Sequence, residues 1–215
     1  MISKKLLFSS TILSLPGLIS IFISLLAIPI HLKIAGIENY GNYLMFHLLL
    51  TISLLFNLGI SKSTVISINN FPKYKEEVAF EGIKYTLFIC FFIFLLLILI
   101  LFFFQGVFSD KKIFLIKYCS LGIIISLFFL CFEGIFLGNE KFKFLSLFNF
   151  IFYSFALSVP SLMLTFYEDL TLENLILISL TIKFSTILLM IFVLSLKKLI
   201  KKNKKKILLN NLKRN

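Results

Sequence analysis

The chain has 215 residues, of which 59% are apolar and only 15% are charged, with a mean hydropathy of +1.02. The apolar residues stand in long blocks without the polar face of a soluble helix or strand, which excludes an ordinary soluble domain and favours helices in a bilayer. The net charge is +12, but nine of the 22 Lys and Arg residues lie from residue 197 onward. A folded basic face suited to nucleic acid is therefore not indicated.

Six apolar runs are each long enough for a membrane-spanning helix, which takes about 20 residues. We predict an all-α, polytopic six-helix bundle over residues 1–196 and a basic cytoplasmic tail over residues 197–215. The spans are expected at about 12–32, 43–60, 85–104, 113–132, 144–167 and 175–196. The first run is too long for the apolar part of a signal peptide, so we expect a retained helix.

The first two runs are separated by residues 29–43, which we interpret as a tight reversal. Gly36 and Gly41 allow the backbone to bend there. Pro16 and Pro29 predict kinks in the first helix, because proline removes a backbone donor. In lipid such kinks need neighbours that satisfy the freed carbonyls, so we expect this helix to pack inside the bundle.

Six spans place both termini on one side of the membrane. That side receives 17 of the 22 basic residues, whereas the opposite side receives four and one lies within a span. The positive-inside rule then predicts cytoplasmic termini in the cell inner membrane, with the reversal at residues 29–43 outside. The tail is predicted either as an interfacial helix on the anionic leaflet or as a disordered basic segment.

Two ionisable residues lie within or at the end of predicted spans. Lys183 falls inside the sixth span, where a lysine costs about 2.5–3.5 kcal/mol on insertion scales. It is either a cation for an anionic group such as a diphosphate or a snorkelling side chain. Glu133 ends the fourth span, either as an interfacial carboxylate paired with Lys141 or Lys143, or as a coupling site for a proton or cation.

The remaining candidate residues indicate neither metal binding nor catalysis. His31 and His47 flank the reversal without a helix-spaced carboxylate or second histidine, so we expect interfacial hydrogen bonding and no metal or cofactor. No catalytic motif is present, and we expect no enzyme activity. The cysteines form no C-x-x-C pair and are expected to pack as small apolar residues: Cys90, Cys119 and Cys131.

Three stretches, in this order, resemble one family. They are the opening helix with Pro29 followed by AGIENYGNY, the stretch NLGISKSTV, and FEGIFLGNEKFKFLSLFNFI before the fifth span. The chain resembles the polysaccharide biosynthesis/export proteins of the O-antigen flippase type, within the multidrug/oligosaccharidyl-lipid/polysaccharide (MOP) superfamily. The resemblance covers most of residues 1–195. It departs from the family at Asn57, where an aspartate is favoured.

The resemblance implies that the chain flips an undecaprenyl-diphosphate-linked oligosaccharide across the membrane for O-antigen, lipopolysaccharide or capsule synthesis. Its implied partners are this lipid-linked saccharide and membrane lipids, and no nucleic acid. Two six-helix halves of such proteins enclose a cationic cavity. Lys183 would then be the cavity cation, Lys62 would meet the headgroup at the cytoplasmic entrance, and Asn57 would lie near it.

Family members generally have twelve or more spans, so the resemblance is to an N-terminal half. We expect one half of a transporter, a truncated member or a homodimerising subunit. Two other functions stay open. One is a cation-coupled multidrug-type antiporter of the same superfamily, although the first span has no carboxylate to carry the ion. The other is a non-transporting membrane scaffold for glycan assembly.

Overall fold

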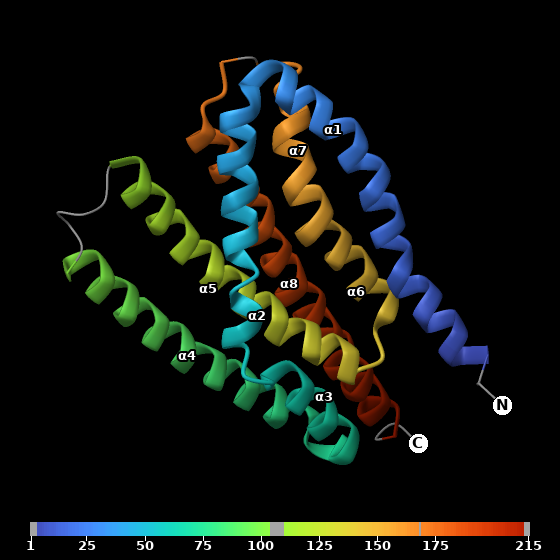
Figure 1. Ribbon diagram of the computed structural model, residues 1–215. Coiled ribbons are helices and arrows are strands. Elements are labelled where there is room, and N and C mark those ends of the chain that lie inside the picture. The colour runs from blue at the N-terminus through green and yellow to red at the C-terminus, as the bar shows by residue number, and fades with distance from the viewer. Residues whose placement is uncertain (1–3, 104–109, 168, 213–215) are drawn as a thin grey trace.

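The computed structural model describes residues 4–103, 110–167 and 169–212, and within these ranges the chain is about 90% helical without a strand. The all-α prediction is therefore confirmed. The elements follow one another as α1 (Lys4–Leu50), α2 (Ser53–Phe56), α3 (Ile60–Asn70), η1 (Pro72–Tyr74), α4 (Lys75–Phe103), α5 (Asp110–Gly138), α6 (Phe142–Asn149), η2 (Phe150–Phe155), α7 (Ala156–Met163) and α8 (Leu172–Leu212) (Figure 1).

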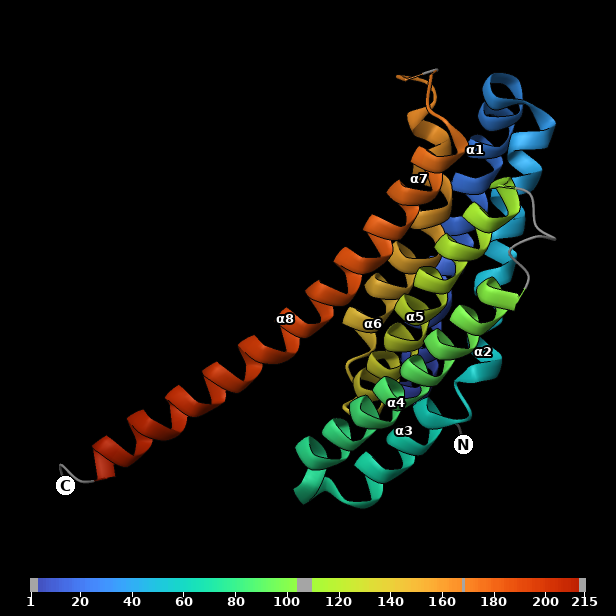
Figure 2. The same cartoon turned by 90° about the vertical axis from the view of Figure 1, so that its left-hand side faces the viewer.

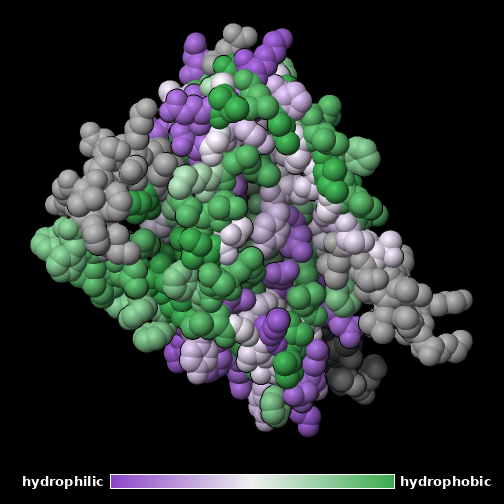
Figure 3. All heavy atoms as spheres, in the orientation of Figure 1, coloured by the Kyte–Doolittle hydropathy of each residue, from purple (hydrophilic) through white to green (hydrophobic). Residues whose placement is uncertain are grey.

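By length and composition, five helical stretches can cross a membrane. They are Ser14–Phe56, Pro72–Leu99, Ile116–Gly138, Phe142–Met163 and Leu172–Ser195. Large apolar side chains also cover the outside, and Phe88, Phe91 and Phe92 of α4 are each more than 60% exposed. An apolar surface of this extent suits hydrocarbon and not water. The chain is therefore a multi-pass membrane protein, with hydrophobic residues over most of the face seen in Figure 3.

The stretch Ser14–Phe56 contains both of the first two predicted spans, because α1 folds back on itself at Gly36 (Figure 1). Gly36 has φ 82° and ψ 167°, a conformation essentially restricted to glycine. The reversal thus lies within the predicted residues 29–43, but it is sharper than expected because helix continues up to it from both sides. Pro16 and Pro29 lie inside the helical part.

Two predicted spans do not coincide with the helix bounds. The second span was expected at about 43–60, but α1 ends at Leu50 and turns follow at residues 51–52 and 57–59. The third span was expected from about residue 85, whereas the helix that contains it, α4, already begins at Lys75. The stretch KEEVAFEGIK consists largely of helix-forming residues, with Glu76 and Glu77 in the first turn near the positive end of the helix dipole.

The fifth predicted span consists of three elements, α6, the π-helical η2 and α7, and it ends at Met163. The sixth is part of a 41-residue helix, α8. The backbone of the basic segment is helical as far as Leu212, so α8 continues past the bundle (Figure 2). The predicted boundary at residue 196 between bundle and tail is not a break in the backbone.

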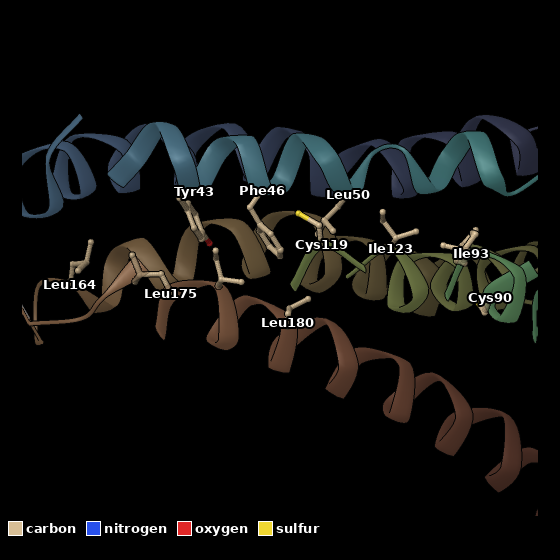
Figure 4. Close-up of a cluster of buried hydrophobic side chains, with 12 residues drawn as sticks. Tyr43, Phe46, Leu50, Cys90, Ile93, Cys119, Ile123, Leu164, Leu175 and Leu180 are labelled. Carbon is tan, nitrogen blue, oxygen red and sulfur yellow. The ribbon is translucent and has the colours of Figure 1, made fainter. Parts of the chain in front are cut away.

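The core forms around α5, the most buried of the five stretches. One apolar cluster joins α1 to α4, α5, α7 and α8, and Figure 4 shows Tyr43, Phe46 and Leu50 projecting toward the other helices. A second cluster lies between α5, α6, η2 and α8. Its central residues are Phe129, Phe132, Phe136, Phe148, Phe152, Ile187 and Met190. The three cysteines are buried and free, as predicted for apolar packing.

Small residues allow the closest helix contacts. A Cβ atom on Gly134 of α5 would lie 2.7 Å from the carbonyl oxygen of Ser61 and 3.0 Å from its Cα atom. Because these are backbone atoms, α3 cannot move aside without moving as a whole. A Cβ on Gly82 would lie 2.9 Å from Oγ1 of Thr64. Gly59 differs, since open space surrounds it and its φ of 77° shows that it serves a turn.

We predict that Gly36→Ala lowers the free energy of unfolding by about 1–3 kcal/mol, because an L-residue is strained at this φ and ψ. Thermal unfolding of the purified protein in one detergent measures the change. Gly41→Ala is the matched control, since Gly41 lies in the helix after the reversal with no atom within 4 Å of a new Cβ. Equal melting temperatures for the two variants would contradict the role given to Gly36.

We also predict that Gly134→Ala destabilises the protein by about 1–3 kcal/mol, because the added methyl group forces α3 and α5 apart. The same unfolding measurement applies. Gly17→Ala, whose new Cβ would meet nothing within 4 Å, is expected to leave the melting temperature unchanged or to raise it. A Gly134→Ala protein as stable as the parent would show that the α3–α5 contact can relax.

Candidate functional site

Lys183 of α8 is buried inside the bundle, with only 4% of its surface exposed. Its Nζ atom lies 4.7 Å from the centre of the Phe152 ring, within the range of a cation–π interaction. In the described part of the chain, no carboxylate forms an ion pair with it. The alternative of a snorkelling lysine is therefore contradicted, because the ammonium group faces the protein interior.

α1 and α8 present polar groups to each other beside this lysine. His47 of α1 lies near Lys183, and its Nε2 atom is 3.3 Å from the hydroxyl of Ser179. The ring of Tyr43 packs edge-on against His47 at 4.7 Å. Tyr43 and His47 are four residues apart, as are Ser179 and Lys183, so each pair occupies one face of its helix.

The same set of polar groups extends to α7. His31 is fully buried, and its Nδ1 atom shares a hydrogen bond of 2.8 Å with the hydroxyl of Ser161. The ring centre of Tyr43 lies 5.3 Å from that of His31, and the Tyr43 hydroxyl donates to the carbonyl of Leu157 at 2.9 Å. The predicted hydrogen bonding of His31 is thus made inside the protein, to Ser161. We call this set the polar core: His31, Tyr43, His47, Ser161, Ser179 and Lys183.

Glu133 of α5 lies close to the polar core but outside it. It is half-buried and lies near the Asn149 side chain and Tyr153. The ring of Tyr153 contacts the ring of Phe152, and the Lys183 ammonium lies over that second ring. Both aromatic residues belong to the π-helical η2, and such segments often occur at functional sites.

The other two predicted site residues lie elsewhere. Lys62 is exposed on α3, and Asn57 accepts a 3.4 Å hydrogen bond from the backbone N–H of Ser61 at the start of that helix. α3 lies at the end of the bundle where α1 begins (Figure 1). The structure therefore does not bring Lys62 or Asn57 to Lys183. Among the described residues, no group of three or more His, Cys, Asp or Glu side chains is placed to hold a metal ion.

The polar core is closed in this conformation. A hollow of only about 40 Å³ lies between the two halves of α1 and α7, lined by Ser24, Tyr43, Ser158 and Ser161 among others. It is large enough for a water-sized group and not for a sugar. Figure 3 shows hydrophilic and intermediate residues along a line between the second half of α1 and the α6–α7 region. A polar track thus follows the bundle beside the core.

Chemically, the polar core offers an ammonium group, hydroxyls and imidazoles in an environment without bulk water. Such donors stabilise an anionic oxygen more strongly there than at a surface. Within the described ranges no carboxylate belongs to the set, so the charge of Lys183 is offset only by the Phe152 ring and by dipoles. The arrangement is suited to binding an anionic ligand.

Comparisons of the chain with protein-family models, curated proteins and solved structures give no match. The resemblance to the polysaccharide flippases stays a prediction from the sequence stretches quoted above.

We predict that Lys183→Met raises the free energy of unfolding by about 1–3 kcal/mol, because it removes an unpaired charge from an apolar interior at nearly constant volume. Lost cation–π energy offsets part of this gain. The measurement is the melting temperature in a single detergent. Lys62→Met, at an exposed lysine, is the control and is expected to change little. A lower melting temperature for Lys183→Met would mean that the lysine stabilises the fold.

Proposed function

We propose that this protein moves a lipid-linked anionic saccharide across the membrane, as the flippases that it resembles do. The observation that carries the proposal is the buried charge of Lys183 without a carboxylate partner in the described part of the chain. A group that costs stability and pairs with nothing acidic in the fold is readily explained by a ligand. A diphosphate cannot cross hydrocarbon unaided, and a cation inside the bundle lowers that barrier.

The proposal includes six membrane crossings with both termini on the cytoplasmic side. It is supported by the reversal of α1 at Gly36, which makes two antiparallel passes of one apolar stretch. The beginning of α1 and the end of α8 lie at the same end of the bundle in both views (Figures 1 and 2). Lys73, Lys75, Lys141 and Lys143 belong to segments at that end, in agreement with the positive-inside rule.

Transport by this route requires the contacts around the polar core to open. The headgroup would meet Lys183 from the side where α1 and α7 enclose the small hollow, while the lipid tail stays in the bilayer. The hydrogen bonds that join α1 to α7 and α8, His31–Ser161 and His47–Ser179, are the contacts that must be exchanged. In the resembled family a second six-helix half completes the cavity.

One observation favours a second candidate, the cation-coupled antiporter. Glu133 is a half-buried carboxylate within a stretch apolar enough to span the membrane, and it lies beside Asn149 and Tyr153. Coupling ions bind such carboxylates in transporters. Proton-coupled drug efflux by cells expressing the chain, lost in Glu133→Gln and kept in Lys183→Met, would favour this function over saccharide transport.

The saccharide proposal is tested in a strain without its own O-antigen flippase. Co-expression of this chain with the C-terminal half of a full-length flippase is expected to restore surface polysaccharide, whereas the chain alone is not. Lys183→Met is expected to reduce the restored amount at least tenfold, because a buried charge pair with the diphosphate is worth more than about 1.4 kcal/mol. Lys183→Arg keeps the charge and is expected to retain part of the activity.

Lys84→Gln is the matched control, since this lysine of α4 is exposed and has no role in the proposed transport step. Immunoblots of the membrane fraction establish that all variants are present in equal amounts. Full restoration of surface polysaccharide by Lys183→Met would show that Lys183 takes no part in transport. Absence of restoration by the parent chain with any second half would contradict the proposed function itself.

A further inference from the structure

A groove of about 810 Å³ lies between α4, α5 and α8, on a different part of the bundle from the polar core. Its volume falls in the range of small-molecule sites, about 300–1,000 Å³. Its walls are apolar along most of their length, with Phe80, Ile83, Ile125, Phe128, Ile187 and Leu188 among the lining residues. None of the six residues of the polar core lines it, so it is a separate site.

The polar lining residues gather at one end of the groove. They are Lys75 and Glu76 at the start of α4, Asn139 and Lys141 between α5 and α6, and Ser195 of α8. These positions belong to the end of the bundle where α1 begins (Figures 1 and 2). The groove therefore has a polar mouth and an apolar interior, which is the distribution of a lipid headgroup and its chain.

The length of the groove matches one leaflet of a bilayer. Along α8 its lining runs from Phe184 to Ser195, which corresponds to about 16 Å of helix. The hydrocarbon core of a bilayer is about 30 Å thick, so each leaflet contributes about half of that. A chain that enters at the mouth ends near the midplane. This depth suits an acyl chain better than the much longer chain of a polyprenyl lipid.

The mouth carries more positive than negative charge. Lys75 and Lys141 face one carboxylate, Glu76, among the lining residues, and the Lys141 ammonium lies 5.1 Å from the centre of the Phe136 ring. The neighbouring charges that do not line the groove balance, with Lys73 and Lys143 against Glu77 and Glu140, and α8 continues beyond Ser195 with lysines at positions 197, 198, 201 and 202. Basic residues near a membrane surface attract anionic lipid headgroups.

We propose that this groove binds one anionic glycerophospholipid from the leaflet at that end of the bundle. An acyl chain lies against α4, α5 and α8, and the phosphate lies at Lys75 and Lys141. The bound lipid fills the space between α4 and α8 and is not the transported molecule. The inference is independent of the proposed function, since it rests on the shape and charge of the groove alone.

The test is native mass spectrometry of the purified full chain in detergent with equimolar phosphatidylglycerol and phosphatidylcholine of identical acyl chains. We expect one retained phosphatidylglycerol per chain, preferred over phosphatidylcholine at least fivefold, since each lysine near the phosphate contributes a factor of about five. Lys75→Gln with Lys141→Gln is expected to bring the preference to within twofold. Lys73→Gln with Lys143→Gln, outside the lining, is the control and should keep it.

The apolar part is tested with two neighbouring leucines of α8 that are about equally exposed, Leu188 at 50% and Leu189 at 48%. Only Leu188 lines the groove. Leu188→Trp is expected to reduce phosphatidylglycerol retention at least fivefold, whereas Leu189→Trp leaves it unchanged. The lysine pair at the mouth gives a second measurement if Leu188→Trp fails to fold.

Three results would overturn the inference. One is equal retention of the two phospholipids by the parent chain. Another is full retention by Leu188→Trp at an unchanged melting temperature. The third is displacement of phosphatidylglycerol by an equimolar polyprenyl diphosphate, which would assign the groove to an isoprenoid chain.

Discussion

One buried ammonium group, that of Lys183, constrains which side chains can pack in the middle of this bundle. A charge in an apolar bundle must be stabilised nearby, and Lys183 has the face of the Phe152 ring for this purpose. The ring is placed beneath the ammonium by η2, whose π-helical turn lies in the middle of the α6–α7 stretch. His47 beside the ammonium shares a hydrogen bond with Ser179 and packs against Tyr43, so α1, η2 and α8 meet around this one charge.

Much of the fold follows from the apolar blocks, because a run of about 20 such residues has few alternatives to a membrane helix. The exceptions are local. The start of α4 was missed because Glu76 and Glu77 look like a loop in a hydropathy profile, although they favour a helix N-terminus. The reversal was located by its glycines, but only the backbone shows that Gly36 alone makes it.

The site was predictable in part. Lys183 stands out in any apolar run, and the four-residue spacings of Tyr43 with His47 and of Ser179 with Lys183 mark two polar helix faces. The partnership of His31 with Ser161 spans 130 residues and arises only from tertiary packing. Nothing in the sequence signals the π-helical turn of η2. Asn57 and Lys62 were predicted as site residues from their place in a family pattern. In the structure Asn57 lies in the turn before α3 and Lys62 lies on α3, away from Lys183.

The length of α8 has a mechanical consequence. α8 packs against the bundle as far as Leu194 and then continues to Leu212, over about 27 Å of helix that projects from the bundle (Figure 2). Each degree by which α8 tilts about Leu194 would displace its far end by about 0.5 Å, so the reach of the basic segment depends on how α8 packs in the bundle.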